Sequence, residues 1–143
     1  MAKGDGYIIT AKSEHEFTAI LFNYKYIGSR LSLAKQFWDI PDDISAYLED
    51  QKNCFVSLEI RKITAGRYKL WQHILDSRHG SVYDAWLGLS AIDNPRPNET
   101  AWLEQTCVPD LKIAFLEAIE NIRIDCELEP NEVRLLEINR VLE

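Results

Sequence analysis

The sequence has few cysteines, and they show no arrangement that builds a site. Cys54, Cys107 and Cys126 lie far apart, and an odd number cannot all pair within one chain. No CxxC pair and no histidine–cysteine spacing typical of zinc ligands occurs. This excludes a disulfide framework and a zinc module, and it favours a reducing, cytoplasmic location. Cys126 alternates with apolar neighbours, so we expect it to be a small buried side chain.

Long hydrophobic runs and an excess of basic charge are also missing. No apolar run approaches the about 20 residues of a membrane span, and the start, MAKGDGYIIT, lacks the hydrophobic stretch of a signal peptide. The formal net charge is −7. Such a chain has no electrostatic footprint for nucleic acid or anionic lipid. We therefore expect no nucleic-acid partner and no membrane, and the sequence leaves the oligomeric state open.

What is present fits one globular domain. The 143 residues are 46% hydrophobic and 27% charged, an ordinary composition for a folded protein. A chain of this length can bury its own core. We assign residues 1–143 to a single domain. The strand pattern begins almost at the first residue, so we expect the domain to be part of a longer protein.

Alternating apolar and polar residues predict about seven β-strands. The clearest pattern is NIRIDCELEP, where Ile122, Ile124, Cys126 and Leu128 face inward. The strands are expected at residues 6–10, 16–26, 53–63, 67–76, 110–119, 121–130 and 131–142. Only a short turn around Gly66 separates the third strand from the fourth, so we expect these two to pair as an antiparallel hairpin. Residues 28–51 are expected to be mostly irregular.

The pattern changes between residues 81 and 108, where two short helices are expected. Helical spacing relates four apolar residues, Val82, Tyr83, Trp86 and Leu87, and Gly88 ends this helix. The second helix is expected to start with Asn98 as its N-cap and to end before Pro109. Strands with one small helical insertion at about 81–108 predict a mainly β fold, an antiparallel β-sandwich.

The segment from 76 to 90, DSRHGSVYDAWLGLS, concentrates chemically capable side chains. His79 is a possible base, but no serine or cysteine stands out as a nucleophile, so we expect a loop histidine whose ring bonds a backbone carbonyl. Arg78 is expected to pair with Asp76 or Asp84, a contact worth little if exposed. Asp84 is expected to cap or pair locally, because it has no companion ligands for a metal.

Two aromatic residues of the same segment are expected to serve packing. Tyr83 and Trp86 fall on one apolar helical face. We expect this face to pin the helix to the sandwich, against the strands around Trp71 and Ile74.

The motifs of the second half resemble the C-terminal region of β-xylosidases of glycoside hydrolase family 39. The resemblance follows AGRYKLWQHILDSRHGSVYDAWLGLS, then NPRPNETAWLEQ, and then LEPNEVRLLEINRV, with RHGSVYDAW as its most specific motif. GYIIT and ILFNYKYI resemble the family's strands after its barrel. The resemblance covers most of the chain and is weakest at 28–50. Some bacterial regulators of the AraC type also look like fusions of a DNA-binding region to such a module.

The resemblance implies an accessory β-sandwich whose catalytic (β/α)₈ barrel is not in this chain. In the family both catalytic glutamates lie on that barrel, which needs about 250 residues. An Asn-Glu pair precedes the family's acid/base position, and such pairs occur here at 98–99 and 131–132. Helix capping and turn formation explain both pairs. We therefore assign no catalytic residue, no cofactor-binding residue and no metal ligand, and we expect the chain by itself not to be an enzyme.

The four tryptophans raise carbohydrate binding as an alternative, because sugar rings stack on flat aromatic faces. Core or interdomain packing accounts for Trp71, Trp86 and Trp102, which leaves Trp38 as the open candidate. The sequence therefore favours a noncatalytic accessory domain that braces the barrel of a β-xylosidase-like protein or regulator. The alternative is a carbohydrate-binding module for xylan-type sugars. Whether residues 78–86 reach the barrel's active site is left open.

Overall fold

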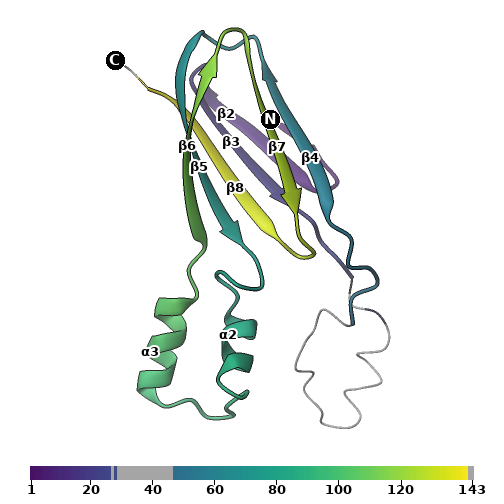
Figure 1. Cartoon of the computed structure of the whole chain (residues 1–143), viewed down its shortest axis with the longest axis vertical. Helices are drawn as coiled ribbons and strands as arrows, with labels where there is room; N and C mark the ends of the chain where they lie inside the picture. Colours follow the sequence, from purple (N-terminus) through teal and green to yellow (C-terminus); the bar gives the residue numbers. More distant parts are fainter. Residues whose placement is uncertain (27, 29–46, 142–143) are drawn as a thin grey trace.

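The computed structural model describes residues 1–26, 28 and 47–141 (Figure 1). Its elements are β1 (Ala2–Gly4), β2 (Tyr7–Ser13), β3 (Glu16–Phe22), β4 (Cys54–Arg61), β5 (Gly66–Leu75), α2 (Val82–Gly88), α3 (Pro97–Thr106), β6 (Asp110–Ala118), β7 (Asn121–Leu128) and β8 (Val133–Arg140). Most of the irregular segment predicted at 28–51 lies outside the described residues, as does Trp38.

The strands form two antiparallel sheets that face each other. One sheet has six strands in the order β1-β2-β3-β8-β5-β6, and the other pairs β4 with β7. Figure 1 shows the two-stranded sheet lying across the larger one. The prediction of an antiparallel β-sandwich with two short helices is confirmed.

The core lies between the sheets and follows the alternation read from the sequence. Along β7 every second residue is buried, and these are the four residues predicted to face inward. The largest fully buried side chains are Leu21, Tyr68, Leu128, Leu136 and Ile138. Burying an aliphatic or aromatic side chain of this size contributes about 1.5–3 kcal/mol. The inward faces of both sheets therefore supply the main driving force for folding.

The predicted hairpin between the third and fourth strands is wrong. β4 pairs with β7 from Cys54↔Leu128 to Arg61↔Asn121, whereas β5 pairs with β6 and β8 in the other sheet. The connection crosses between the sheets and buries Ile63, whose N–H donates to the Glu120 carbonyl at 3.1 Å. Alternation identifies which face of a strand is buried but not which strand lies beside it.

The two helices lie together beyond one end of the sandwich, below the sheets in Figure 1. α2 packs against α3, and none of its residues is fully buried. The prediction that Tyr83 and Trp86 are buried against the strands around Trp71 and Ile74 is therefore wrong. Sequence periodicity showed an apolar helical face, but α2 lies against α3 and the Trp86 N–H bonds the Ile92 carbonyl. Among the described residues no helix is long and apolar enough to cross a membrane.

The N-cap of α3 also differs from the prediction. The helix begins at Pro97 with Arg96 as N-cap, rather than at Asn98. Proline suits the first helical position, because its missing N–H would have no partner there. The Glu99 carboxylate accepts a hydrogen bond from the Arg96 N–H at 2.6 Å. Glu99 therefore serves helix capping, as expected for the first Asn-Glu pair.

Candidate functional site

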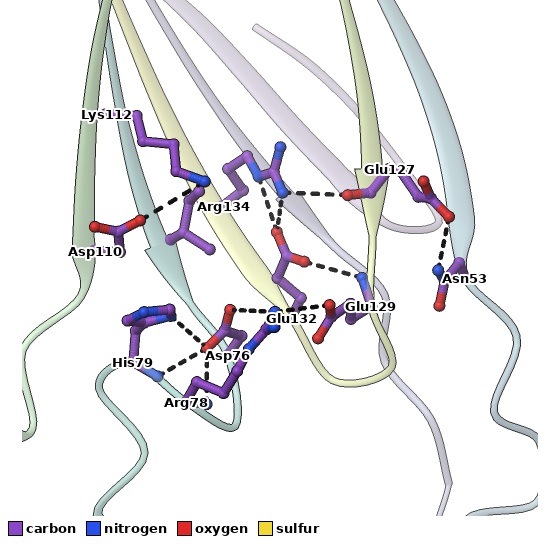
Figure 2. Close-up of a pocket in the computed structure, with 11 residues that line it drawn as sticks. Asn53, Asp76, Arg78, His79, Asp110, Lys112, Glu127, Glu129, Glu132 and Arg134 are labelled. Atoms are coloured by element: carbon purple, nitrogen blue, oxygen red, sulfur yellow. Dashed lines mark hydrogen bonds and ion pairs between the residues drawn. The ribbon is translucent and has the colours of Figure 1, made fainter.

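Charged side chains replace apolar ones between the sheets at the end of the sandwich nearest the helices. On the inner face of β8, Leu136 and Ile138 are fully buried, and the next position on that face is Arg134, opposite Ile74 of β5. A cavity of about 360 Å³ opens here, which we call the charged cavity (Figure 2). Its charged lining residues include Asp76, Arg78, His79, Asp110, Lys112, Glu132 and Arg134.

Asp76 organises the loop that follows β5. Its carboxylate accepts hydrogen bonds from the N–H groups of Arg78 and His79, both at 2.8 Å, and lies 2.9 Å from the His79 ring Nδ1. Burial alone would raise the pKa of Asp76, but these hydrogen bonds outweigh it and the pKa lies below its ordinary value. His79 thus bonds a carboxylate, and the prediction of a backbone carbonyl partner is wrong.

Gly80 explains why the loop can close on itself. Its φ is +83°, a conformation that side chains other than glycine rarely adopt. A Cβ at this position would clash with the Leu75 side chain. The Asp76 N–H donates to the His79 carbonyl at 3.0 Å and completes the tight turn. The RHG part of the motif is therefore a turn built around one buried carboxylate.

Arg78 ties this loop to the turn between β7 and β8. Its Nη2 lies 2.7 Å from Glu129 Oε1 and 3.5 Å from Asp76 Oδ2, as Figure 2 shows. Of the two partners predicted for Arg78, the structure selects Asp76. The Arg78 side chain is 64% exposed, so the energetic value of these ion pairs is small. They position the loop rather than hold the fold together.

Glu132 and Arg134 form a second, more buried pair beside the first. Arg134 donates from Nε at 2.8 Å and from Nη2 at 2.5 Å to Glu132 Oε1, and the Glu129 N–H donates to Glu132 Oε2 at 2.9 Å. Asn131, with φ +60°, occupies the turn before β8. The second Asn-Glu pair therefore forms a turn, as the sequence indicated.

The charged cavity has parts of a catalytic arrangement but does not complete one. A histidine held by a buried carboxylate is half of a nucleophile-activating triad. Among the described residues that line this cavity there is no serine or cysteine. In the described part of the chain no group of three or more histidine, cysteine or acidic side chains is placed to hold a metal. These contacts link the loop that follows β5 to the turn between β7 and β8.

Asp84 caps α2, as predicted, through an exchange with Ser81. The Ser81 hydroxyl accepts from the Asp84 N–H at 3.3 Å and donates to the Asp84 carboxylate. The neighbouring Cys107 thiol lies 3.8 Å from the Ser81 carbonyl. These contacts tie the start of α2 to the residue that follows α3.

The described tryptophans have three different environments, none of them the sandwich core. The Trp86 N–H donates to the Ile92 carbonyl at 2.9 Å, and its ring lies 6.0 Å from that of Tyr83. Trp71 lies on the outer face of the larger sheet with Lys69 Nζ 4.5 Å from its ring centre. Trp102 is 45% exposed on α3. The sequence assigned these three side chains to core or interdomain packing but could not give the exposure of each.

Cys126 is buried in the core, which confirms the prediction for it. Burial raises the pKa of its thiol, so the side chain is a poor nucleophile near neutral pH. Sequence reasoning missed the Glu132–Arg134 pair. The available signal was an arginine at an inward position of the alternation that continues through Leu136 and Ile138.

The fold has known relatives, although the sequence itself matches no protein-family model and no curated protein. A GH39 enzyme from Xanthomonas axonopodis pv. citri matches with a TM-score of 0.64 at 13% identity, over 96% of this chain and 26% of that chain. A monomeric β-xylosidase from Caulobacter crescentus CB15 matches with a TM-score of 0.64 at 15% identity, over 98% and 27%.

A bacterial orthologue of human α-L-iduronidase gives the same result. It matches with a TM-score of 0.63 at 14% identity, over 95% of this chain and 22% of that chain. The chain therefore spans about a quarter of the length of the enzymes it matches. At this level of identity the likeness establishes a shared fold.

Proposed function

We propose that this chain is a noncatalytic accessory β-sandwich of a protein related to glycoside hydrolase family 39. One observation carries the proposal. Nearly the whole chain superimposes on family-39 enzymes but covers only 26% and 27% of the first two. A module of that relative size braces a catalytic part rather than replacing it.

The architecture supports a noncatalytic role. A retaining glycosidase places two carboxylates about 5 Å apart on a barrel of about 250 residues. The strand pairs of the described residues are all antiparallel, whereas such a barrel needs parallel strands. The carboxylates nearest the charged cavity are engaged in turns and ion pairs. None of these three carboxylates, of Asp76, Glu129 and Glu132, is free to act as an acid or a nucleophile.

A bracing module needs a surface that its partner covers, and the outer face of the six-stranded sheet has that character. In register across five strands lie Leu111, His73, Leu135, Ile20 and Ile8. Ile113 and Phe115 continue the exposed row along β6, at 50% and 52% exposure. We call this surface the apolar outer face. Contiguous exposed apolar patches on soluble proteins mark interaction sites.

Several polar and charged side chains on this face already contact a partner side chain. His73 Nε2 lies 3.1 Å from Glu137 Oε2. Lys69 covers the Trp71 ring, and the Arg67 guanidinium lies 4.2 Å from the centre of the Phe115 ring. A partner can therefore cover the face without leaving many unpaired charges, whose burial would be costly.

We assign the apolar outer face to the barrel of the same parent protein. Strands about 4.8 Å apart and about 25 Å long give the six-stranded sheet a face on the order of 700 Å² before side-chain relief is counted. Stable interfaces bury about 800 Å² per partner. The face alone therefore supplies much of the area that a stable interface needs.

The parent is a β-xylosidase-like enzyme or an AraC-type regulator carrying the module, with the reducing cytoplasm as its location.

The experiment begins with the complete reading frame that contains this sequence. We expect it to encode a barrel-sized segment, whereas an adjoining helix-turn-helix region alone would identify a regulator without a barrel. In the full-length protein, amide hydrogen exchange along β6 should be slower than in the isolated chain. If β6 exchanges equally fast in the full-length protein and in the isolated chain, the apolar outer face is not the contact with the barrel. If exchange along β6 slows only when the isolated chain is concentrated, the face contacts a second copy of this chain instead.

Activity provides an independent check. The isolated chain should not hydrolyse aryl xylosides or arabinosides above the buffer rate. Turnover that survives repurification and disappears on replacement of one of its glutamates would overturn the noncatalytic assignment.

A further inference from the structure

A second cavity, of about 250 Å³, lies within the helical insertion. Three segments enclose it: the loop after β5, α2 and α3. Trp102 and Thr106 line it from one face of α3, four residues apart. Gly88 lines it from α2, and a Cβ built at Gly88 meets no atom within 4 Å, so the space before it is open. We call it the Trp102 cavity.

Trp102 is a half-exposed tryptophan that lines this cavity. It is 45% exposed, and no hydrogen bond from its indole N–H is found within the described ranges. The Trp86 indole, by contrast, is tied to the Ile92 carbonyl, and Lys69 covers the ring of Trp71. A half-exposed aromatic side chain that lines a cavity and has an unused donor combines apolar contact area with hydrogen-bonding capacity, as a small polar-ring site requires.

Polar groups stand around this ring. Ser77, Arg78, Ser81 and Asp84 line the same cavity. The Arg78 Nη2 is already paired with Glu129 and Asp76, so its remaining guanidinium donors, Nε and Nη1, are the ones left for a ligand. The Asp84 carboxylate accepts from Ser81 but retains further acceptor sites. One guanidinium and one carboxylate give the lining a formal charge of zero, which favours a neutral ligand over an anion or a cation.

The cavity's size narrows the ligand further. Pockets for drug-sized ligands measure about 300–1,000 Å³, and they are mostly apolar with a few placed polar groups. At about 250 Å³ the Trp102 cavity is slightly smaller, and Trp102, Ala85 and Gly88 supply its apolar wall. It suits one ring with an apolar face and hydroxyls at its edge.

We propose that the Trp102 cavity binds a single neutral pyranose ring, stacked on the Trp102 indole and hydrogen-bonded at its edge by Asp84, Ser81 and Arg78. The module thus binds sugar through its helical insertion, at a residue that the sequence assigned to packing. This inference does not depend on the accessory role, because the cavity is complete within this chain. A protein with no barrel could still have the site.

The test is a titration of the 143-residue chain followed by tryptophan side-chain NMR signals. D-xylose and D-glucose should shift one indole signal saturably, with a Kd in the millimolar range expected for a ligand of so few atoms. Sorbitol supplies similar hydroxyls without a flat ring face and should cause no saturable shift. Equal saturable shifts with sorbitol would overturn the stacking geometry, and no saturable shift with either sugar would overturn the site.

Two variants locate the binding. Trp102→Ala should remove the shifted signal and weaken binding at least about tenfold, while Phe55→Ala, an exposed aromatic on the opposite sheet, should bind normally. Gly88→Leu fills the open space from α2 with a better helix former and should also weaken binding. Circular dichroism checks that each variant is folded. Unchanged affinity in both cavity variants would place the sugar elsewhere and refute the proposal.

Discussion

The two outer faces of the sandwich carry opposite chemistry. On the two-stranded sheet, Arg61 Nη2 lies 2.6 Å from Glu59 Oε2, and Arg123 Nε lies 3.1 Å from Asp125 Oδ1. Phe55 is the large apolar side chain exposed there. On the six-stranded sheet the exposed positions of β6 are largely apolar.

β6 makes the contrast sharpest, because three of its large apolar side chains point outward. Leu111, Ile113 and Phe115 are about half-exposed, while Ala114, Leu116 and Ala118 occupy the core face. β7 does the reverse, with its apolar residues inward and its charged residues outward. A strand with Leu, Ile and Phe on its outer side is typical of a sheet whose outer face is covered by a partner. The outer face of the two-stranded sheet, with its charged side chains, is typical of a surface exposed to solvent.

The largest effect is expected from comparing inner and outer leucines. Leu136→Ala removes a fully buried side chain and should lower the free energy of unfolding by about 2–5 kcal/mol. Leu111→Ala changes a half-exposed side chain on the apolar outer face and should stay within about 0.5–1 kcal/mol in the isolated chain. Urea unfolding measures both. Similar losses would mean that the outer face stabilises the isolated fold.

The second-largest loss of stability is expected at Asp76, because its carboxylate is buried, whereas the ion pairs on the two-stranded face are exposed to solvent. Asp76→Asn removes the negative charge that accepts hydrogen bonds from three N–H groups. It should lower the free energy of unfolding by about 1.5–3 kcal/mol. The pKa of Asp76 is lower in the folded state, so its contribution is present above the unfolded pKa and disappears as pH falls through the lowered value. Urea unfolding from pH 6 to pH 2 should show the difference between wild type and Asp76→Asn shrinking with acid. A constant difference would contradict the linkage.

A charge placed on the apolar outer face should disrupt the contact with the parent's barrel. Ile113→Asp should weaken association about 10- to 100-fold when module and barrel are supplied as separate chains, because a buried unpaired carboxylate has no partner. Phe55→Asp puts the same charge on the two-stranded face and should leave association unchanged. Calorimetric titration compares the two. If Phe55→Asp has the larger effect, the assignment of the faces is reversed.

The smallest effect is expected on the two-stranded face. Hydrogen bonds from Arg61 and Asn121 hold the pKa of Glu59 below its ordinary value, but the pair is exposed to solvent. Glu59→Gln should therefore leave the melting temperature nearly unchanged at physiological salt. A drop comparable to that of Asp76→Asn would show that this exposed pair is stabilising after all.

The sequence by itself determined which residues face inward and what class of fold results. Period-two alternation gave the four buried positions of β7, and helical spacing gave both helices of the insertion. The turn at Asn131–Glu132 and the capping of α2 by Asp84 were also predicted, because their partners are only a few residues away. Local preferences of this kind act over one turn or one strand and are readable in a single sequence.

Only the tertiary structure decided which elements are neighbours. β4 lies beside β7 rather than β5, α2 packs on α3 rather than on the strands, and His79 bonds Asp76 rather than a carbonyl. The apolar outer face likewise became visible only once register set Leu111 beside His73 and Leu135. An apolar side chain gains the same transfer free energy against any apolar surface, so hydrophobic pattern fixes burial while chain topology chooses the partner.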